Sequence, residues 1–204
     1  MGYTFLIDTY ETERMKTLST WSTFKDEDLK RRPHPEDRRG RNALEHMVHQ
    51  CMGENLWFSN MLGIDVGAPP LPEQETRLEF IKRYAEDSGK RLTALREKDD
   101  AWWEEEVKFF TVTRSRAWVV TRRIAHTAHH RGQLTMLLRI LGREIYSTYG
   151  PTADTGGLMQ NKAETIYPYP SVEALIAGET DGGSNRVPLP GPGDKPCTER
   201  PDPQ

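Results

Sequence analysis

The sequence predicts an all-α protein: a four-helix bundle with an irregular C-terminal extension. Four segments repeat apolar residues at intervals of three and four, the period of a helix with one buried face. Packing four such stripes against one another is the economical way to bury them. The bundle and a C-terminal wrap are expected to occupy residues 1–178. Residues 179–204 are expected to be a disordered tail, because positions 181–204 carry six prolines and four glycines.

Composition narrows the class of protein. The 204 residues include 28 Lys and Arg against 31 Asp and Glu, a formal net charge of -3, so nucleic acid is not an expected partner. No stretch approaches the roughly 20 apolar residues of a membrane span, and the first residues lack a secretory leader pattern. Cys51 and Cys197 cannot form a disulfide framework. These features predict a cytoplasmic protein without a membrane partner.

The first helix is expected over residues 7–21, where only Arg14 interrupts the apolar stripe. That stripe consists of Ile7, Tyr10, Leu18 and Trp21. Residues 24–40 contain two prolines and a closing glycine, which predicts a connection. Glu36 and Asp37 interrupt its basic side chains, which favours a solvated loop over an anion site. The basic side chains are Lys30, Arg31, Arg32, Arg38, Arg39 and Arg41.

The second helix has both a start and a stop signal. Asn42 is a good N-cap, and Glu45 three residues later can return a hydrogen bond to the cap amide. The helix is expected to end near Leu62, because Gly63 can adopt the left-handed C-cap conformation. Prolines at positions 69–70 reinforce that stop.

The rest of the chain is expected to complete the bundle. The third helix is expected to open at residues 72–75, and residues 107–113 predict a short extended segment. The fourth helix is expected over residues 118–141, ending at Gly142. Beyond it, residues 150–169 are expected to wrap one end of the bundle, before a short helix over residues 171–177. The apolar stripe that the third helix is expected to bury consists of Leu78, Ile81, Ala85, Leu92 and Leu95.

Five of the six histidines fall into two groups on predicted helices. The second helix carries His46 and His49, and the fourth carries His126, His129 and His130. Imidazole is a common ligand of transition metals, and two histidines four residues apart share one helix face. A pair from one helix and a third histidine from another would leave an open coordination position, as in catalytic sites.

Helical phase selects some of these histidines. At about 100° per residue, His126 and His130 lie on the stripe that faces the core, whereas His129 lies outside it. On the second helix, helical phase does not decide which histidine joins this pair. His49 lies on a second apolar face, and His46 lies nearer the polar side. Spacing alone also leaves open that the histidines are ordinary polar or core residues.

These motifs resemble the DinB/YfiT-like metalloenzyme family, whose members are four-helix bundles with a three-histidine metal site. The family signature is one histidine on the second helix and an HxxxH pair on the fourth, followed by Arg-Gly-Gln. Residues 126–133 match the second motif. Acidic residues and then an aromatic one stand at the family's offsets from His49, namely Glu45, Glu54 and Trp57. The resemblance covers about residues 5–142, although Arg41 replaces the usual tryptophan.

The resemblance implies the metal ligands His49, His126 and His130, and a divalent metal ion. Three imidazoles suit zinc, nickel, iron or copper, of which zinc, nickel or iron is expected. Related bundles include S-transferases and isomerases that use low-molecular-weight thiols such as mycothiol or bacillithiol, with a small molecule as substrate. The ion would bind the thiol as thiolate or activate a water for hydrolysis. No residue is assigned a catalytic role, and the question whether the chain forms a homodimer stays open.

Two other functional classes remain as alternatives. The first is a non-catalytic metal- or ligand-binding bundle that acts as a sensor or interaction module. The second is a purely structural bundle. Cys51, two positions from His49, is expected in the core, and Glu54 is expected to be solvated more readily than to support the metal. Aromatic packing is favoured over a pocket or dimer contact for Trp102, Trp103, Phe109 and Phe110.

Overall fold

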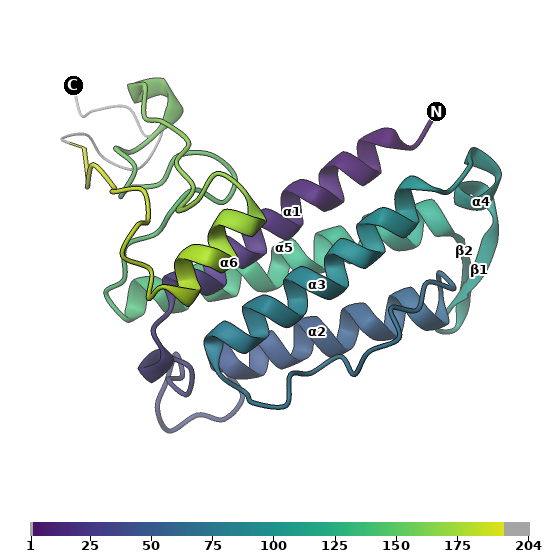
Figure 1. Ribbon diagram of the computed structural model, residues 1–204, viewed down its shortest axis with the longest axis horizontal. Coiled ribbons are helices and arrows are strands. Elements are labelled where there is room, and N and C mark those ends of the chain that lie inside the picture. The colour runs from purple at the N-terminus through teal and green to yellow at the C-terminus, as the bar shows by residue number, and fades with distance from the viewer. Residues whose placement is uncertain (1, 194–204) are drawn as a thin grey trace.

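Four long helices pack side by side as a bundle in the computed structural model, which describes residues 2–193 (Figure 1). They are α1 (Thr4–Thr23), α2 (Ala43–Asn60), α3 (Arg77–Arg96) and α5 (Arg116–Ile140). Helix α1 packs against α3 and α5, and α2 packs against the same two helices, so α1 and α2 occupy opposite corners. The predicted four-helix bundle is confirmed.

Shorter elements complete the described chain. The predicted extended segment is a two-stranded antiparallel hairpin in which Phe109 pairs with Val112. Its turn places Phe110 at a φ of 51°, the left-handed conformation that two-residue hairpin turns require. The hairpin and α4 lie at one end of the bundle, and the segment after α5 lies at the other (Figure 1). The short elements are η1 (Asp26–Asp28), α4 (Asp100–Glu104), β1 (Glu106–Phe109), β2 (Val112–Ser115), η2 (Met159–Asn161) and α6 (Val172–Thr180).

The ends of the helices follow from local hydrogen bonds. The capping box of α2 is present: the Glu45 amide donates to Asn42 Oδ1 at 2.8 Å, and the Asn42 amide donates to Glu45 Oε2 at 3.0 Å. Helix α3 begins later than expected, because Thr76 is its N-cap and accepts from the Glu79 amide. Gly63 follows α2 with a φ of 67°, which agrees with the expected stop.

The core consists of two apolar clusters separated along the helices by polar side chains. One cluster contains Leu18, Trp21, Met47, Phe80, Ile81 and Leu137. The other contains Phe58, Leu62, Leu95, Trp103, Val119 and Val120. Arg14 breaks the stripe of α1 because its guanidinium donates to Ser88 Oγ at 2.7 Å and to the Ala85 carbonyl at 2.6 Å on α3. The interruption seen in the sequence is therefore a polar contact between two helices.

The segment after α5 is attached to the bundle by polar contacts. Helix α6 packs against α1 and α3. Glu179 accepts from the Tyr169 hydroxyl at 2.7 Å and from Arg77 and Arg186 at 2.5 and 2.8 Å. The Tyr146 hydroxyl donates to the Val187 carbonyl at 2.7 Å. Within the expected tail, Glu179 contacts Arg77 of α3 and Arg186 donates to the Ser22 carbonyl of α1, and residues 194–204 lie outside the described chain.

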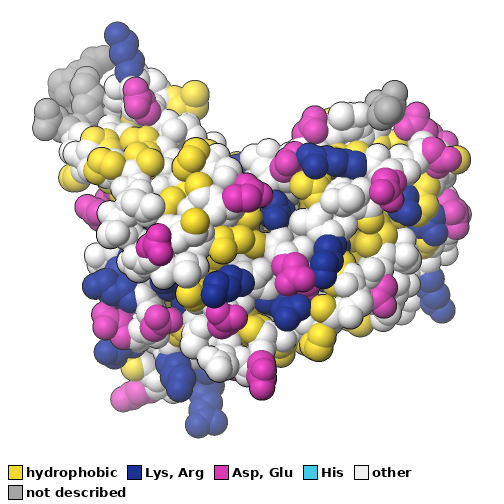
Figure 2. Space-filling view, viewed as in Figure 1, with side chains coloured by type: hydrophobic (Ala, Val, Ile, Leu, Met, Phe, Trp, Pro, Cys, Tyr) yellow, Lys and Arg dark blue, Asp and Glu magenta, His cyan; other side chains and the backbone are white. Residues whose placement is uncertain are grey.

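The molecular surface shows charges of both signs. Basic and acidic side chains are interspersed over the face in Figure 2, in keeping with the nearly balanced composition. Within residues 2–193, none of the helices is both long and apolar enough to cross a lipid bilayer.

Candidate metal centre

Three imidazoles from two helices converge on one point of the bundle. His49 comes from α2, and His126 and His130 come from successive turns of α5. One ring nitrogen from each lies within 4.8 Å of the other two. The HxxxH spacing brings the two α5 rings together edge to face, with centroids 4.5 Å apart, and the packing of α2 against α5 brings in the third.

The hydrogen bonds of these rings leave lone pairs available for a cation. His130 Nε2 and His126 Nε2 are 3.2 Å apart, and at most one of two facing imidazole nitrogens can donate. His49 Nε2 is buried and has no hydrogen-bond partner in the described chain. A buried nitrogen without a partner is costly. A divalent ion shared by the three rings would satisfy all of these nitrogens, so the residues present fit a metal.

Gln133 fixes the ring of His130. Its Oε1 lies 2.9 Å from His130 Nδ1 and accepts a hydrogen bond from that nitrogen, which leaves His130 Nε2 unprotonated toward His126 and His49. The Gln133 amide nitrogen lies 3.2 Å from His129 Nε2 and donates to it. An oriented second hydrogen bond of this kind is usual for a metal-binding histidine.

The imidazoles are held in the neutral form that binds metals. Burial lowers the pKa of His126 to about 3, and the positive charge of Arg123 acts in the same direction. Burial also lowers the pKa of His130 to about 4, although its hydrogen bond with Gln133 opposes that change. Burial and the charges of Arg41 and Arg123 lower the pKa of His49. All three rings are thus uncharged at neutral pH.

The arginine of the His-Arg-Gly-Gln motif anchors α5 to α1. Arg131 is buried, and its Nη2 forms an ion pair of 2.5 Å with Glu13 Oε2. The Arg131 guanidinium also lies over the ring of Tyr149, 5.2 Å from its centroid. Since Arg131 follows His130 directly, this anchor fixes the turn of α5 that carries the His130 imidazole.

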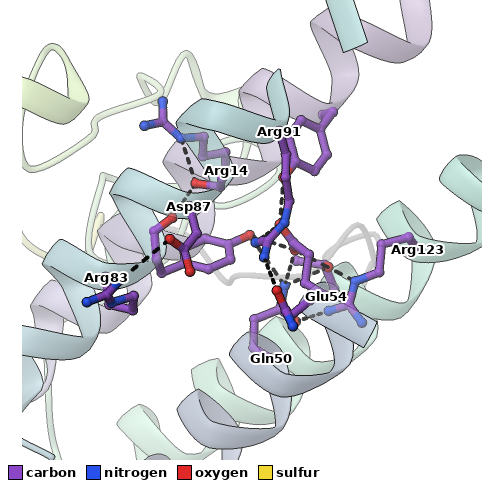
Figure 3. A network of polar contacts seen from close by, with 12 residues as sticks. Arg14, Gln50, Glu54, Arg83, Asp87, Arg91 and Arg123 are labelled. Atoms are coloured by element: carbon purple, nitrogen blue, oxygen red, sulfur yellow. Dashed lines mark hydrogen bonds and ion pairs between the residues drawn. The ribbon is translucent and has the colours of Figure 1, made fainter. Parts of the chain in front are cut away.

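A buried polar network surrounds Glu54, which lies five residues after His49 on α2 (Figure 3). Arg91 and Arg123 approach Glu54 from two sides, at 3.5 and 3.7 Å. Glu54 also accepts from Tyr10 at 2.5 Å and from Gln50 at 2.9 Å. The expectation that Glu54 is solvated is wrong, because its exposed fraction is 0%. Its charge is tolerated there because two guanidiniums and several donors surround it.

This network reaches the three-imidazole group through Arg123. The Arg123 guanidinium donates to Gln50 Oε1 at 2.5 Å and lies 5.6 Å from the centroid of Trp57. The Trp57 ring in turn lies 5.7 Å from that of His126. One carboxylate, Glu54, faces two arginines, so the network presents positive charge to the imidazoles.

The other histidines and Cys51 lie outside the three-imidazole group. His129 is exposed, and His46 is buried with its ring centroid 5.4 Å from that of His130. Cys51 is buried and free, and burial raises the pKa of its thiol. It is a core residue, as expected. A thiol with a raised pKa is also a poor nucleophile. Cys197 lies outside the described residues.

The aromatic residues around the hairpin mostly pack against one another. Trp103 is buried and stacks on Tyr3 at 5.5 Å between ring centroids. Phe109 contacts the edges of Trp57 and Trp118. Phe110 remains largely exposed at the hairpin turn. Trp57 connects this aromatic group to His126, whose ring it contacts.

Comparison with known proteins agrees with the fold and the motif. The model of the DinB family matches residues 4–162, which is most of the chain. The chain belongs to the DinB family. A solved DinB-like protein from Bacillus cereus ATCC 10987 superposes with a TM-score of 0.63 at 20% identity, covering 71% of this chain and 95% of that chain. At this identity the likeness supports the fold alone. No curated protein matches the chain significantly.

Several supporting residues of this DinB-family centre were not assigned roles from the sequence. In the sequence Gln133 is only part of the motif, although its position three residues after His130 places both on one helix face. Arg123 and Gln50 gave no signal, since their roles depend on Glu54 becoming buried between helices. Arg41 was noted only as a departure from the family pattern, yet its charge acts on His46, His49 and His130.

Proposed function

We propose that this DinB-family chain is a divalent-metal-dependent enzyme whose ligands are His49, His126 and His130. The observation that supports this most is the convergence of three neutral imidazoles within 4.8 Å. Two of them, His49 and His126, have a buried nitrogen with no hydrogen-bond partner in the described chain. Zinc, nickel or iron suits such a nitrogen ligand set. A small molecule is the proposed substrate.

The composition of the group supports catalysis over a closed structural site. Within residues 2–193, no cysteine, carboxylate or further histidine joins the three imidazoles. Three protein ligands leave room for an exchangeable fourth, which is the pattern of catalytic zinc sites. A sensor or a structural site would instead be expected to use four protein ligands.

The proposed chemistry is transfer or hydrolysis by a nucleophile at that position. When bound, a divalent ion would lower the pKa of a coordinated thiol or water, so that the group acts as a nucleophile near neutral pH. The chain itself contributes two groups. Gln133 accepts a hydrogen bond from His130 Nδ1 and so keeps the proton on that nitrogen, and Arg123 places a positive charge beside His126. That charge favours an anionic nucleophile over its protonated form.

Elemental analysis of tagless protein, purified without chelator, tests the metal site. We expect about one ion per chain in the parent and a large loss in His130→Ala. The matched control is His129→Ala, which removes the neighbouring exposed imidazole and should leave the stoichiometry unchanged. No ion in the parent, even after reconstitution, would overturn the proposal.

Cobalt(II) substitution tests the exchangeable position and the thiol chemistry. Adding a small thiol to the cobalt protein should produce a thiolate-to-cobalt charge-transfer band, and the pH dependence of that band reports the pKa of the bound thiol. A spectrum that neither thiol nor other exogenous ligands change would indicate a closed site, and would favour the sensor alternative.

A further inference from the structure

A basic cavity opens beside the metal centre, between the loop before α2, the first turn of α2 and α5. Its volume is about 590 Å³. It adjoins His130 through two residues of its wall: Gln133 accepts the hydrogen bond from His130 Nδ1, and the His46 ring centroid lies 5.4 Å from that of His130. The side chains that define its character are Arg38, Arg39, Arg41, Glu45, His46 and Gln133.

The acidic groups near this cavity are already paired. Glu45 accepts from Arg32 at 2.5 and 2.9 Å and from the Asn42 amide at 3.0 Å. Arg39 forms an ion pair of 2.8 Å with Asp37. Arg38 and Arg41 form no ion pair with any described carboxylate. Two exposed guanidiniums are therefore left without an ion-pair partner in the described chain at the cavity.

His46 supplies an independent indication of a ligand. Its side chain contributes to the cavity wall and its exposed fraction is only 5%, yet its buried Nδ1 has no hydrogen-bond partner in the described chain. Buried polar groups normally have a partner. An oxyanion in the cavity would supply an acceptor for an imidazole N–H of His46 as well as for the two guanidiniums.

We propose that this cavity binds an oxyanion group, a carboxylate or a phosphate, of the substrate whose reacting atom meets the three imidazoles. The sequence favoured a solvated loop over an anion site at residues 30–41. Most of that loop is exposed, as expected, and part of it forms the cavity wall together with Gln133 of α5. The assignment as a substrate subsite rests on the proposed function, because the reaction takes place at the metal centre. The substrate class is thus a small anionic molecule, held by Arg38 and Arg41 as its reactive end approaches the metal.

Anion titration of the full-length protein tests the subsite. Acetate and inorganic phosphate are titrated separately at constant ionic strength, and the His46 ring resonances are followed by NMR. We expect saturable shifts, and the anion that binds more tightly identifies the oxyanion group. Arg38→Gln with Arg41→Gln should weaken that binding by about tenfold or more. The matched control is Lys30→Gln with Arg31→Gln, which removes the same charge from exposed positions of the loop outside the cavity.

The outcomes separate this inference from the metal proposal. The titration is run on the protein as purified and again after chelator treatment, so that binding by the arginines is measured without a metal ion. Anion binding that persists in a parent shown to hold no metal would keep the cavity site while the proposed enzyme fails. Equal weakening in both double variants would show general charge attraction and overturn the subsite. The absence of saturable shifts with either anion would overturn it as well.

Discussion

Gln133 lies three residues beyond His130, and its Oε1 accepts a hydrogen bond of 2.9 Å from His130 Nδ1. The bond settles which nitrogen of His130 carries the proton, and it directs the other toward His126 and His49. One residue outside the three-imidazole group therefore sets both the tautomer and the ring orientation of a proposed ligand.

Replacing Gln133 by alanine should lower metal affinity by about 10- to 100-fold, the usual cost of losing such a partner. Gln133→Glu keeps an acceptor oxygen and should restore most of the affinity. Competition with a chromophoric chelator measures both variants. Gln160→Ala, at an exposed position, is the control, and an unchanged affinity in Gln133→Ala would contradict this role.

The two histidines of α2 should differ sharply in their effect on metal content. His49→Ala removes a nitrogen of the three-imidazole group and should lose most of the metal. His46→Ala should keep it, because His46 is not a member of that group. Elemental analysis of the two variants side by side decides the matter. Metal loss from His46→Ala, with retention in His49→Ala, would reverse the assignment.

The sequence predicted the bundle because its signals are local. The apolar period on each helix, the Asn42–Glu45 capping box and the HxxxH pair all depend on residues within a few turns of one another. Each was found where it was expected. The predicted start of α3 is wrong because residues 72–75 carry a stronger local start signal than Thr76, which is the N-cap in the structure.

Glu54 shows why the remainder could not be predicted. A lone glutamate is normally exposed, and nothing near it in the sequence indicates otherwise. Its burial depends on Arg91 and Arg123, which come from two other helices and meet it only after packing. The choice between His49 and His46 also depends on packing between helices. Helical phase could not distinguish the two histidines, and only the resemblance to the family favoured His49.

Glu54→Gln should destabilise the fold by about 3–5 kcal/mol, because it leaves two buried guanidiniums without their counter-charge. Urea denaturation followed by circular dichroism gives the free energy of unfolding. Glu97→Gln, which alters an exposed glutamate on the same bundle, should change it by no more than about 0.5 kcal/mol. Comparable small effects from both variants would mean that the network contributes little to stability.

Glu179 should make the attachment of the C-terminal segment sensitive to acid. Burial by itself raises the pKa of Glu179, but hydrogen bonds from Arg186, Tyr169 and Arg77 outweigh it and lower the pKa below its usual value of 4.5. A carboxyl group with a lowered pKa binds fewer protons when folded than when unfolded. Its contribution is therefore present above about pH 4.5 and is lost as the pH falls through the folded value.

Measuring the free energy of unfolding against pH for the parent and Glu179→Gln tests this. At pH 7 the variant should be less stable by about 2 kcal/mol, the range for hydrogen bonds to a charged group. As the pH falls below about 4.5, the two curves should converge, because the parent then loses the charge that the variant already lacks. Glu164→Gln, at an exposed position after α5, should follow the parent throughout. A gap between parent and Glu179→Gln that stays constant with pH would show that packing, and not the charge of Glu179, holds α6 against the bundle.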